Sequence, residues 1–245
     1  MSQLELSLAA QVSSRHLSYV ETGRSQPSRE MVLRLADALD IPLRARNALL
    51  VAAGYAPLYF ETGLGAPEMA QLRRAIELIL HHQEPYPAFV LDRHWNIRMT
   101  NQAAARCTRF LLGAEPNEQN MIRLVMHPDG LRPVLVNWEE TAGDLIRHLQ
   151  ARIAALPSDE RAAALLREVL AYPGVPAGLG SREMGAPTSP LLTTVFRKDA
   201  VELRFFSTIT TFGTPRDVTL EELHIESSFP ADESTATVCR EMFSA

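Results

Sequence analysis

Residues 1–55 show the hydrophobic spacing of consecutive short helices. In the third predicted helix, apolar residues recur at i, i+3, i+4 and i+7 and so share one helical face: Val32, Leu35, Ala36 and Leu39. Residues that favour helix N-termini mark the expected starts, which are Ser2, Ser13, Pro27-Ser28 and Pro42. Gly23 and Gly54 suit the ends of the second and fourth helices. The pattern predicts a small all-α domain over residues 1–58.

The pattern changes near Pro87, after a packed linker and a helix that begins at Pro67. Residues 88–91 form an apolar run, and residues 95–99 alternate between apolar and polar, so both segments predict strands. Asn101 is placed to cap the short helix that follows. The second half of the chain therefore begins with two neighbouring strands rather than with helices alone.

A helical middle and three further strands complete the second half. A long helix is expected from Pro133, and Ser158 is expected to cap another. The Gly- and Pro-rich residues 173–190 predict a long loop. Lys198-Asp199 is the expected hairpin turn within a strand group at 191–197, 201–212 and about 223–229. The order indicates an antiparallel sheet with helices on one face over residues 67–245, and an α+β chain as a whole.

Composition predicts a cytoplasmic protein without membrane insertion. Hydrophobic residues make up 46% and charged residues 22%, which is ordinary for a globular protein. No run approaches the ~20 apolar residues of a membrane span. The N-terminus has neither the basic start nor the apolar block of a signal peptide. Cys107 and Cys239 lie far apart and outside any CxxC pair, so structural thiols are expected.

The net charge of −5 is unevenly distributed along the chain. Residues 1–50 contain six Arg and five acidic residues, a net of +1, so the remainder carries −6. A protein that binds nucleic acid needs a local basic face rather than a basic total. The acidic remainder would repel phosphate, and we expect it to lie away from any DNA.

Residues 3–27 read QLELSLAAQVSSRHLSYVETGRSQP and resemble the helix-turn-helix of the lambda-repressor-like, or XRE, family of transcription regulators. The match comprises Gln at the first helix, Val-Ser at the turn and Glu-x-Gly before Pro. Apolar residues would set the angle between the two helices: Leu6, Val12, Leu17 and Val20. The family commonly has Gly in the turn, where this chain has Gln11, and a non-Gly residue at positive φ costs roughly 1 kcal/mol.

By this resemblance the protein binds double-stranded DNA with its second helix in the major groove. The residues expected at the base edges, together with the N-cap that starts the helix, are Ser13, Ser14, Arg15, His16 and Tyr19. Gln3 and Arg24 would hold phosphates and set the register. Such proteins bind paired half-sites, so a homodimer is expected. The alternative is a plain helical hairpin whose polar residues are only solvated.

The resemblance also implies a helix before Gln3, packed across the other two, whereas the chain begins at Met1. We therefore expect the DNA-binding domain to lack its first helix, which leaves Leu4 and Leu8, and also Val32 and Leu35 on the third helix, partly uncovered. Each large side chain that loses its cover forfeits ~1.5–3 kcal/mol. We expect residues 1–50 to be less stable than the rest and to bind DNA weakly.

Residues 67–245 resemble the ligand-binding domain of MmyB-like regulators, whose fold is PAS-like. Several specific segments carry this resemblance: PAFVLDRHWNI at 87–97, HPDGLRP at 127–133, VNWEE at 136–140, ELRFFSTITTFGTP at 202–215 and IESSFPAD at 225–232. The predicted order of two strands, a helical middle and three strands agrees with a PAS-type sheet.

The resemblance implies a small, mostly apolar ligand, such as a fatty acid. Candidate residues for the wall of its pocket are Phe89, Trp138, Phe196, Phe206 and Ile209, each of which would equally well fill the core. His127 and Arg132 would either meet a ligand carboxylate or tie down the turn at 128–130. The residues alone do not choose between these alternatives.

No motif indicates an enzyme or a cofactor. Glu139-Glu140 and His81-His82 are adjacent pairs, so on a helix their side chains point ~100° apart and make poor catalytic or metal-binding pairs. HExxH, paired CxxC and phosphate-cradling glycine loops are absent from the sequence. We interpret the chain as a ligand-responsive, DNA-binding transcription regulator. The alternatives are an adaptor that works through protein contacts without DNA, and an enzyme of unknown chemistry in the larger domain.

Overall fold

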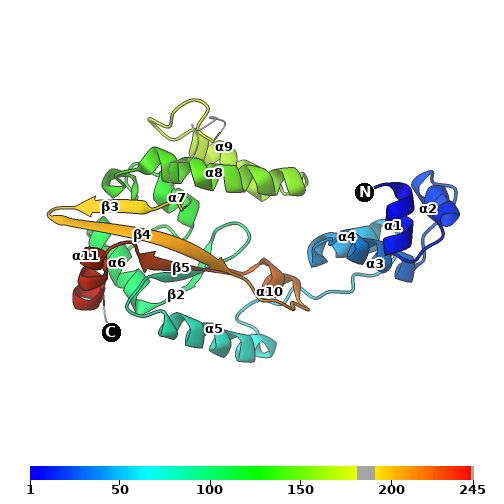
Figure 1. Cartoon of the computed structure of the whole chain (residues 1–245), viewed down its shortest axis with the longest axis horizontal. Coiled ribbons are helices and arrows are strands. Elements are labelled where there is room, and N and C mark those ends of the chain that lie inside the picture. The colour runs from blue at the N-terminus through cyan, green and yellow to red at the C-terminus, as the bar shows by residue number, and fades with distance from the viewer. Residues whose placement is uncertain (181–190, 244–245) are drawn as a thin grey trace. The chain divides into compact units, whose positions relative to one another are not determined.

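The computed structural model describes residues 1–180 and 191–243, which form two compact units (Figure 1). The smaller unit contains residues 1–70 and 212–222, and the larger contains residues 71–211 and the chain from 223 onward. Part of the predicted loop 173–190, residues 181–190, lies outside the described residues. The smaller unit is helical and the larger combines a sheet with helices, so the predicted α+β class is confirmed.

The helices predicted in the smaller unit are confirmed: α1 (Gln3–Ala9), α2 (Ser14–Glu21), α3 (Arg29–Ala38) and α4 (Leu43–Ala52). Ser2, Ser13 and Ser28 cap the first three, because each side chain accepts a hydrogen bond from a backbone N–H of the first turn. Gln11 adopts φ +53° in the turn between α1 and α2. The turn therefore has the left-handed residue that the family provides with glycine.

The core of this unit is made of aliphatic residues from α2, α3 and α4. The buried side chains include Leu17, Val32, Ala36, Leu43 and Leu50. Leu39, predicted on the inner face of the third helix, is instead 45% exposed, because it lies at the C-cap where the helix ends. Burial of each large aliphatic side chain contributes ~1.5–3 kcal/mol, so these few residues provide most of the stabilisation of a small unit.

A helix that sequence patterns did not predict, α10 (Val218–Glu222), completes the smaller unit. Pro42 makes no side-chain cap for α4, and the Glu221 carboxylate instead accepts a hydrogen bond from the Leu43 N–H at 2.7 Å. Arg44 pairs with Glu222 at 2.7 Å and also with Glu61. The N-terminus of α4 is thus capped by residues far along the chain.

The larger unit is built on an antiparallel sheet of β1 (Ala88–Leu91), β2 (Ile97–Thr100), β3 (Thr194–Lys198), β4 (Val201–Thr210) and β5 (His224–Pro230). The strand order is β2-β1-β5-β4-β3, so the last strand lies at the centre and joins the two hairpins. This order has the two strands, helical middle and three strands of the predicted PAS-like arrangement.

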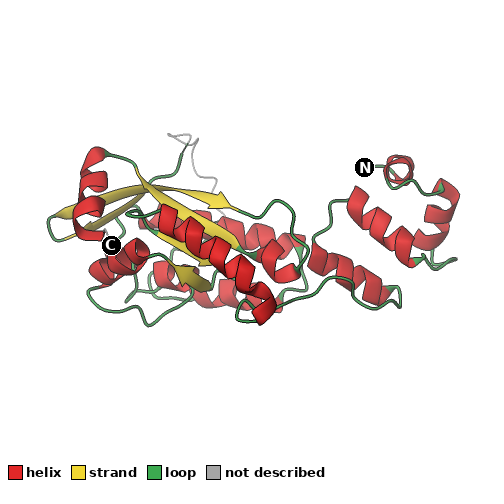
Figure 2. Cartoon of the chain, turned by 90° about the horizontal axis from the view of Figure 1, so that it is seen from below, coloured by secondary structure: helices red, strands yellow, loops and turns green. Residues whose placement is uncertain are grey.

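Helices cover both faces of this sheet, whereas the sequence order had indicated one (Figures 1 and 2). The helices are α5 (Ala70–His82), α6 (Gln102–Leu112), α7 (Met121–Met126), α8 (Trp138–Ala155), α9 (Glu160–Leu170) and α11 (Glu233–Val238). A short 3-10 turn at Arg132–Val134 and a π-helical turn at Cys239–Phe243 complete the unit, and another 3-10 turn, Pro67–Met69, ends the N-terminal stretch of the smaller unit. α8 and α9 lie on one side of the sheet and α5 on the other. No helix in the described part of the chain is both long and apolar enough to cross a membrane.

Several predicted boundaries are wrong by a few residues. Pro133 lies in a 3-10 turn, and the long helix begins only at Trp138. Asp159 rather than Ser158 caps α9, because the Asp159 carboxylate accepts the hydrogen bond from the Ala162 N–H. Lys198 belongs to β3, so the hairpin turn begins one residue later than predicted. Strand pairing decides the end of β3, whereas a local side-chain bond decides the start of α9.

Asn101, the predicted cap of α6, has a wider role because its buried amide joins four segments. Its Oδ1 accepts hydrogen bonds from the N–H groups of Ala88 and Ala104, at 3.0 and 2.9 Å. Its Nδ2 donates to the carbonyls of Leu80 and Tyr86, at 3.4 and 2.8 Å. A primary amide offers two donors and two acceptor sites, and here all four are used. The end of α5, the start of β1, the end of β2 and the start of α6 therefore meet at one side chain.

We predict that Asn101→Ala lowers the free energy of unfolding of the larger unit by about 2–5 kcal/mol. The substitution removes a helix cap and leaves buried N–H and C=O groups without hydrogen-bond partners. Each unpaired buried group costs about 1–3 kcal/mol of stability. Urea unfolding followed by circular dichroism measures the loss. Asn117→Ala, at an exposed loop position, is the control and should change stability by less than about 0.5 kcal/mol. Equal stability of the two variants would show that Asn101 does not join the segments energetically.

Candidate nucleic-acid interface and ligand cavity

The N-terminal turn of α2 presents exposed polar side chains, as the helix-turn-helix resemblance predicts. Ser14 and Arg15 are exposed, while His16 and Tyr19 are partly buried. The Arg15 Nε donates a hydrogen bond to the Tyr19 hydroxyl at 3.1 Å, and its guanidinium carbon lies 5.5 Å from the ring centroid. The two side chains, one helical turn apart, form a single surface of planar cation and aromatic ring.

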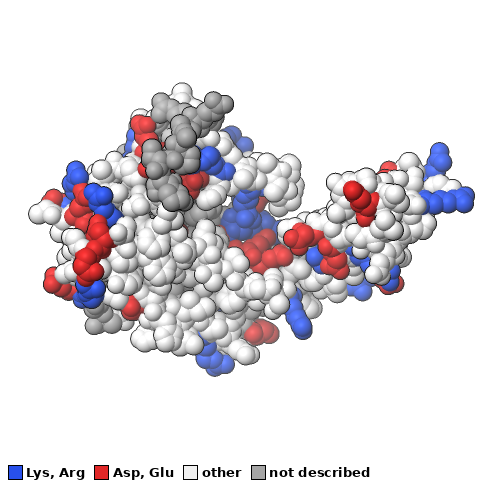
Figure 3. Space-filling model, in the orientation of Figure 1, with Lys and Arg blue, Asp and Glu red and all other residues white. Residues whose placement is uncertain are grey.

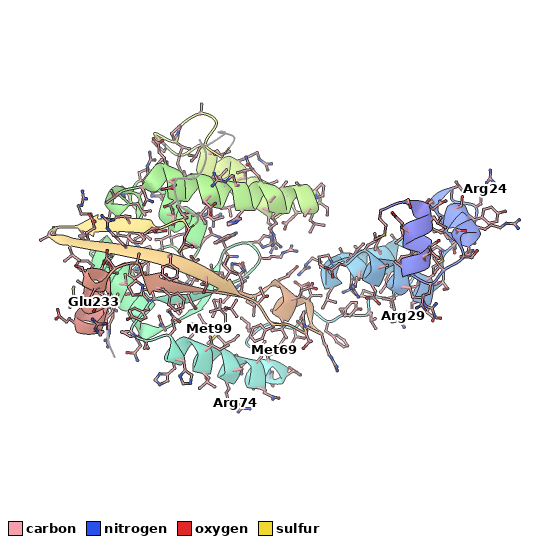
Figure 4. All side chains as sticks on the ribbon, viewed as in Figure 1. Arg24, Arg29, Met69, Arg74, Met99 and Glu233 are labelled. Atoms are coloured by element: carbon pink, nitrogen blue, oxygen red, sulfur yellow. The ribbon has the colours of Figure 1, made fainter. Side chains whose placement is uncertain are left out.

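The arginines of residues 1–50 fall into two groups of three. Arg34, Arg44 and Arg46 bind carboxylates within the smaller unit. Arg15, Arg24 and Arg29 form no ion pair with any residue that the structure describes. Arg24 follows α2 and Arg29 opens α3; Figure 4 shows Arg24 pointing into solvent, and Figure 3 shows basic side chains at the same end of the unit. Sequence reasoning missed Arg29 as a candidate contact, although it was visible as an unmatched charge.

Gln3, predicted to hold a phosphate, has a partner within the protein. Its Nε2 donates a hydrogen bond to the Glu21 carboxylate, which ties the first helix of the motif to the end of the second. A phosphate contact by Gln3 would have to replace this bond. Arg24 has no such competing ion pair among the described residues, so its side chain needs no rearrangement to reach a phosphate.

The outer face of α1 is apolar. Leu4 and Leu8, four residues apart on one side of the helix, are 62% and 70% exposed. These are two of the positions at which the helix-turn-helix resemblance led us to expect missing cover. Their exposure means that they contribute little to the core of the described unit.

A cavity of about 110 Å³ lies in the larger unit, between the sheet and helices α6, α7 and α8. Apolar side chains dominate its helical wall: Leu111, Met121, Leu124, Val125 and Leu145. Phe89, Phe196 and Phe205 line it from the sheet. A more open cleft of about 270 Å³ shares Phe89, Thr108 and Leu124 with the cavity, so the two spaces are neighbours.

Strand periodicity decides which predicted residues reach the cavity. Of the predicted pocket residues, Phe89 and Phe196 lie in its wall. Phe206 follows Phe205, which lines the cavity, and so points to the other face, where it stacks on Phe229 with ring centroids 5.5 Å apart. Ile209, farther along β4, is 54% exposed.

Trp138, Arg132 and His127 hold the fold around the cavity without lining it. The Trp138 Nε1 donates a hydrogen bond to the Val125 carbonyl at 3.0 Å. The Arg132 guanidinium lies 3.9 Å from the Trp138 ring and donates to the Pro173 and Gly174 carbonyls. His127 Nδ1 accepts a hydrogen bond from the Asp129 N–H at 3.1 Å. Of the two roles left open for Arg132 and His127, this geometry corresponds to tying down turns.

Glu226 of β5 is an acidic side chain in the cavity wall, which sequence reasoning did not single out. It pairs in register with Phe89, and period-two alternation places it on the opposite face from the buried Ile225. Burial raises the pKa of the Glu226 carboxyl, and a hydrogen bond with Ser207 and the nearby His148 lower it in part. Alternation with the apolar Ile225 would have assigned this acid to an exposed face, so the sequence carried no signal for its place in the cavity wall.

The described residues contain no group of three or more His, Cys, Asp or Glu side chains able to hold a metal ion. Cys107 and Cys239 are buried and unpaired. Burial raises the pKa of the Cys239 thiol to about 12 and also raises that of Cys107. Both cysteines therefore stay protonated near neutral pH.

Comparison with known families assigns both parts of the chain. The family described as "MmyB-like transcription regulator ligand binding domain" matches residues 72–242, and the family described as "Helix-turn-helix" matches residues 1–45. The first match covers more than half of the chain, so the chain belongs to the MmyB-like transcription regulator ligand binding domain family. The predicted resemblance to both families is confirmed. The chain is therefore a DNA-binding transcription regulator with a ligand-binding domain.

None of the curated proteins compared with the chain matches it. One solved structure, described as "Structure of an RNA-binding Light-Oxygen-Voltage Receptor", is similar at 15% sequence identity with a TM-score of 0.30. The match covers 98% of this chain and 60% of that receptor, so the chain spans less than two thirds of its length. A likeness this weak carries no argument about fold or function.

We predict that Arg15→Ala lowers affinity for an operator selected from random DNA by roughly 1–3 kcal/mol, because a bidentate contact to guanine is lost. Affinity for unrelated DNA should change much less. Fluorescence anisotropy with both DNAs measures the difference. Arg24→Ala is expected to weaken both equally and to reduce the salt slope by about 1.

Arg74→Ala, which changes an exposed arginine of α5, is the control for the loss of one positive charge. It should leave both affinities unchanged. If Arg15→Ala weakens operator and unrelated DNA to the same extent, Arg15 is a phosphate contact and its assignment as a base reader is wrong.

Proposed function

We propose that this protein is a cytoplasmic, sequence-specific transcription regulator, with a DNA-reading domain in residues 1–58 and a sensor domain in 67–245. The observation that carries the DNA-binding half is the group of three arginines without acidic partners among the described residues: Arg15, Arg24 and Arg29. Arg15 lies in the first turn of α2, Arg24 follows the end of α2 and Arg29 opens α3. The helix-turn-helix match supports α2 as the helix that enters the major groove. Base contacts would come from Arg15, and phosphate contacts from Arg24 and Arg29.

The same three arginines argue against a protein adaptor that does not bind DNA. An adaptor would have no need of three arginines without acidic partners among the described residues, within and next to a helix-turn-helix. We propose that two chains bind as a homodimer, because helix-turn-helix readers recognise paired half-sites about 34 Å apart. The role of Ser13 is then to orient the helix, while Ser14, His16 and Tyr19 contribute to reading.

The sensor half of the proposal rests on the cavity and on the family match to residues 72–242. Its wall is mostly apolar, and Phe89 and Phe196 lie on it. A space of about 110 Å³ is smaller than the ~300–1,000 Å³ typical of drug-sized ligands. We propose a small apolar ligand with an acyl or alkyl chain, of the kind that fatty acids contain, and a regulatory rather than catalytic role for its binding.

We predict that such a ligand raises the melting temperature of the full chain. A ligand that binds only the folded state stabilises it by about 2.7 kcal/mol at a hundred times its Kd. The test is differential scanning fluorimetry with medium-chain alkyl and acyl compounds, followed by operator binding with and without the compound that stabilises most. Light scattering of the operator complex reports its stoichiometry.

Leu145→Arg, which introduces a charge into the cavity wall, should abolish the thermal shift but not operator binding. Leu78→Arg, at an exposed position of α5, is the matched control and should keep both. The sensor proposal fails if no compound stabilises the wild-type chain. The DNA-binding proposal fails if selection from random DNA enriches no operator.

A further inference from the structure

The cavity has a polar end that comes mainly from two neighbouring strands. Ser207 of β4 and Ser228 of β5 are register partners, and Glu226 lies two residues before Ser228 on the same face of the sheet. All three line the cavity. A mostly apolar space therefore carries a carboxyl and two hydroxyls close together on the wall formed by the sheet.

A buried hydroxyl on the helical wall has no hydrogen-bond partner among the described residues. Thr141 of α8 lines the cavity and is only 8% exposed, and its Oγ1 bonds to no residue in 1–180 or 191–243. Buried polar atoms are nearly always hydrogen-bonded, and the exceptions need an explanation. A polar atom of a bound ligand would provide the missing partner and would do so inside the cavity.

The described residues that line the cavity include Glu226 but no Lys, Arg or His. A negatively charged ligand group would meet the Glu226 carboxyl with no cation in the cavity wall to balance it. The nearby His148 lies outside the wall, 3.6 Å from Asp144. Arg98, in the neighbouring cleft, is already paired with Asp92 at 2.7 Å. Both the apolar wall and the acid thus disfavour a carboxylate at this end of the cavity.

On the basis of the proposed sensor function, we infer that the ligand carries, on its apolar chain, a hydrogen-bonding head without negative charge, and that Glu226 selects it. An ammonium head would pair with the Glu226 carboxylate. A hydroxyl head would accept a hydrogen bond from the protonated carboxyl, whose pKa burial raises, and donate one to Thr141. Both heads share the chemistry that the polar end offers, whereas a free fatty acid does not.

The test compares three probes with the same chain, namely octanol, octylamine and octanoate, by isothermal titration calorimetry on the full chain at neutral pH. We expect octanol or octylamine to bind at least about tenfold more tightly than octanoate, because octanoate brings a second, unbalanced carboxylate. The preference between octanol and octylamine shows whether Glu226 acts as an acid or as a carboxylate. Either preference supports the inference.

Two variants test whether Glu226 and Thr141 select the head group of the ligand. Glu226→Gln should reduce the discrimination against octanoate by about tenfold, whereas Glu77→Gln, exposed on α5, should leave it unchanged. Thr141→Val should weaken octanol binding while keeping the unliganded protein as stable as wild type or more so. A purely structural role for Thr141 would change stability alone.

Octanoate binding best to the wild-type chain would overturn the inference and leave the proposed sensor function intact. The same holds if Glu226→Gln leaves the order of the three affinities and their ratios unchanged. Binding of none of the three probes, or of any other apolar compound in the panel above, would overturn the sensor function and this inference with it.

Discussion

The larger unit depends on one buried side-chain amide, that of Asn101, whose donors and acceptors are all paired within the protein. Asn101 lies where a helix ends, a hairpin closes and another helix begins, and each of its four hydrogen bonds reaches a different residue. Burying a polar side chain is favourable only when every donor and acceptor is paired. The positions of β1, α5 and α6 therefore depend on one another. The position of Phe89, which lies on β1 in the cavity wall, depends on the same hydrogen bonds.

Local chemistry predicted most of the helices and strands. Ser2, Ser13 and Asn101 were identifiable as caps because a short polar side chain precedes a periodic apolar run. The short helices α7 and α10 escaped prediction, since one turn or two of helix leaves no periodic signal. α10 owes its existence to Glu221 and Glu222, whose partners on α4 are 178 residues away in sequence. No local stretch of sequence indicates such long-range contacts.

The candidate sites were only partly predictable for the same reason. Arg15 and Arg24 could be named because a motif of fixed spacing carries them. In the sensor domain, residue type suggested aromatic candidates, but strand periodicity assigns Phe205 and Phe206 to opposite faces. The sequence did not indicate the position of Glu226, because a glutamate between apolar and small polar residues is typical of an exposed strand position. Its significance arises only when β5 takes the central place in the sheet.

The origin of α10 has a consequence for modularity. The helical unit that carries the DNA-reading motif is not a continuous stretch of chain, because residues 212–222 belong to it and emerge from the connection between β4 and β5. A fragment ending at residue 70 would lack the carboxylates that cap α4 and neutralise Arg44. A single crossover after residue 70 would therefore pair the helical unit of one regulator with the 212–222 segment of another. A working chimera would need residues 212–222 from the same regulator as residues 1–70.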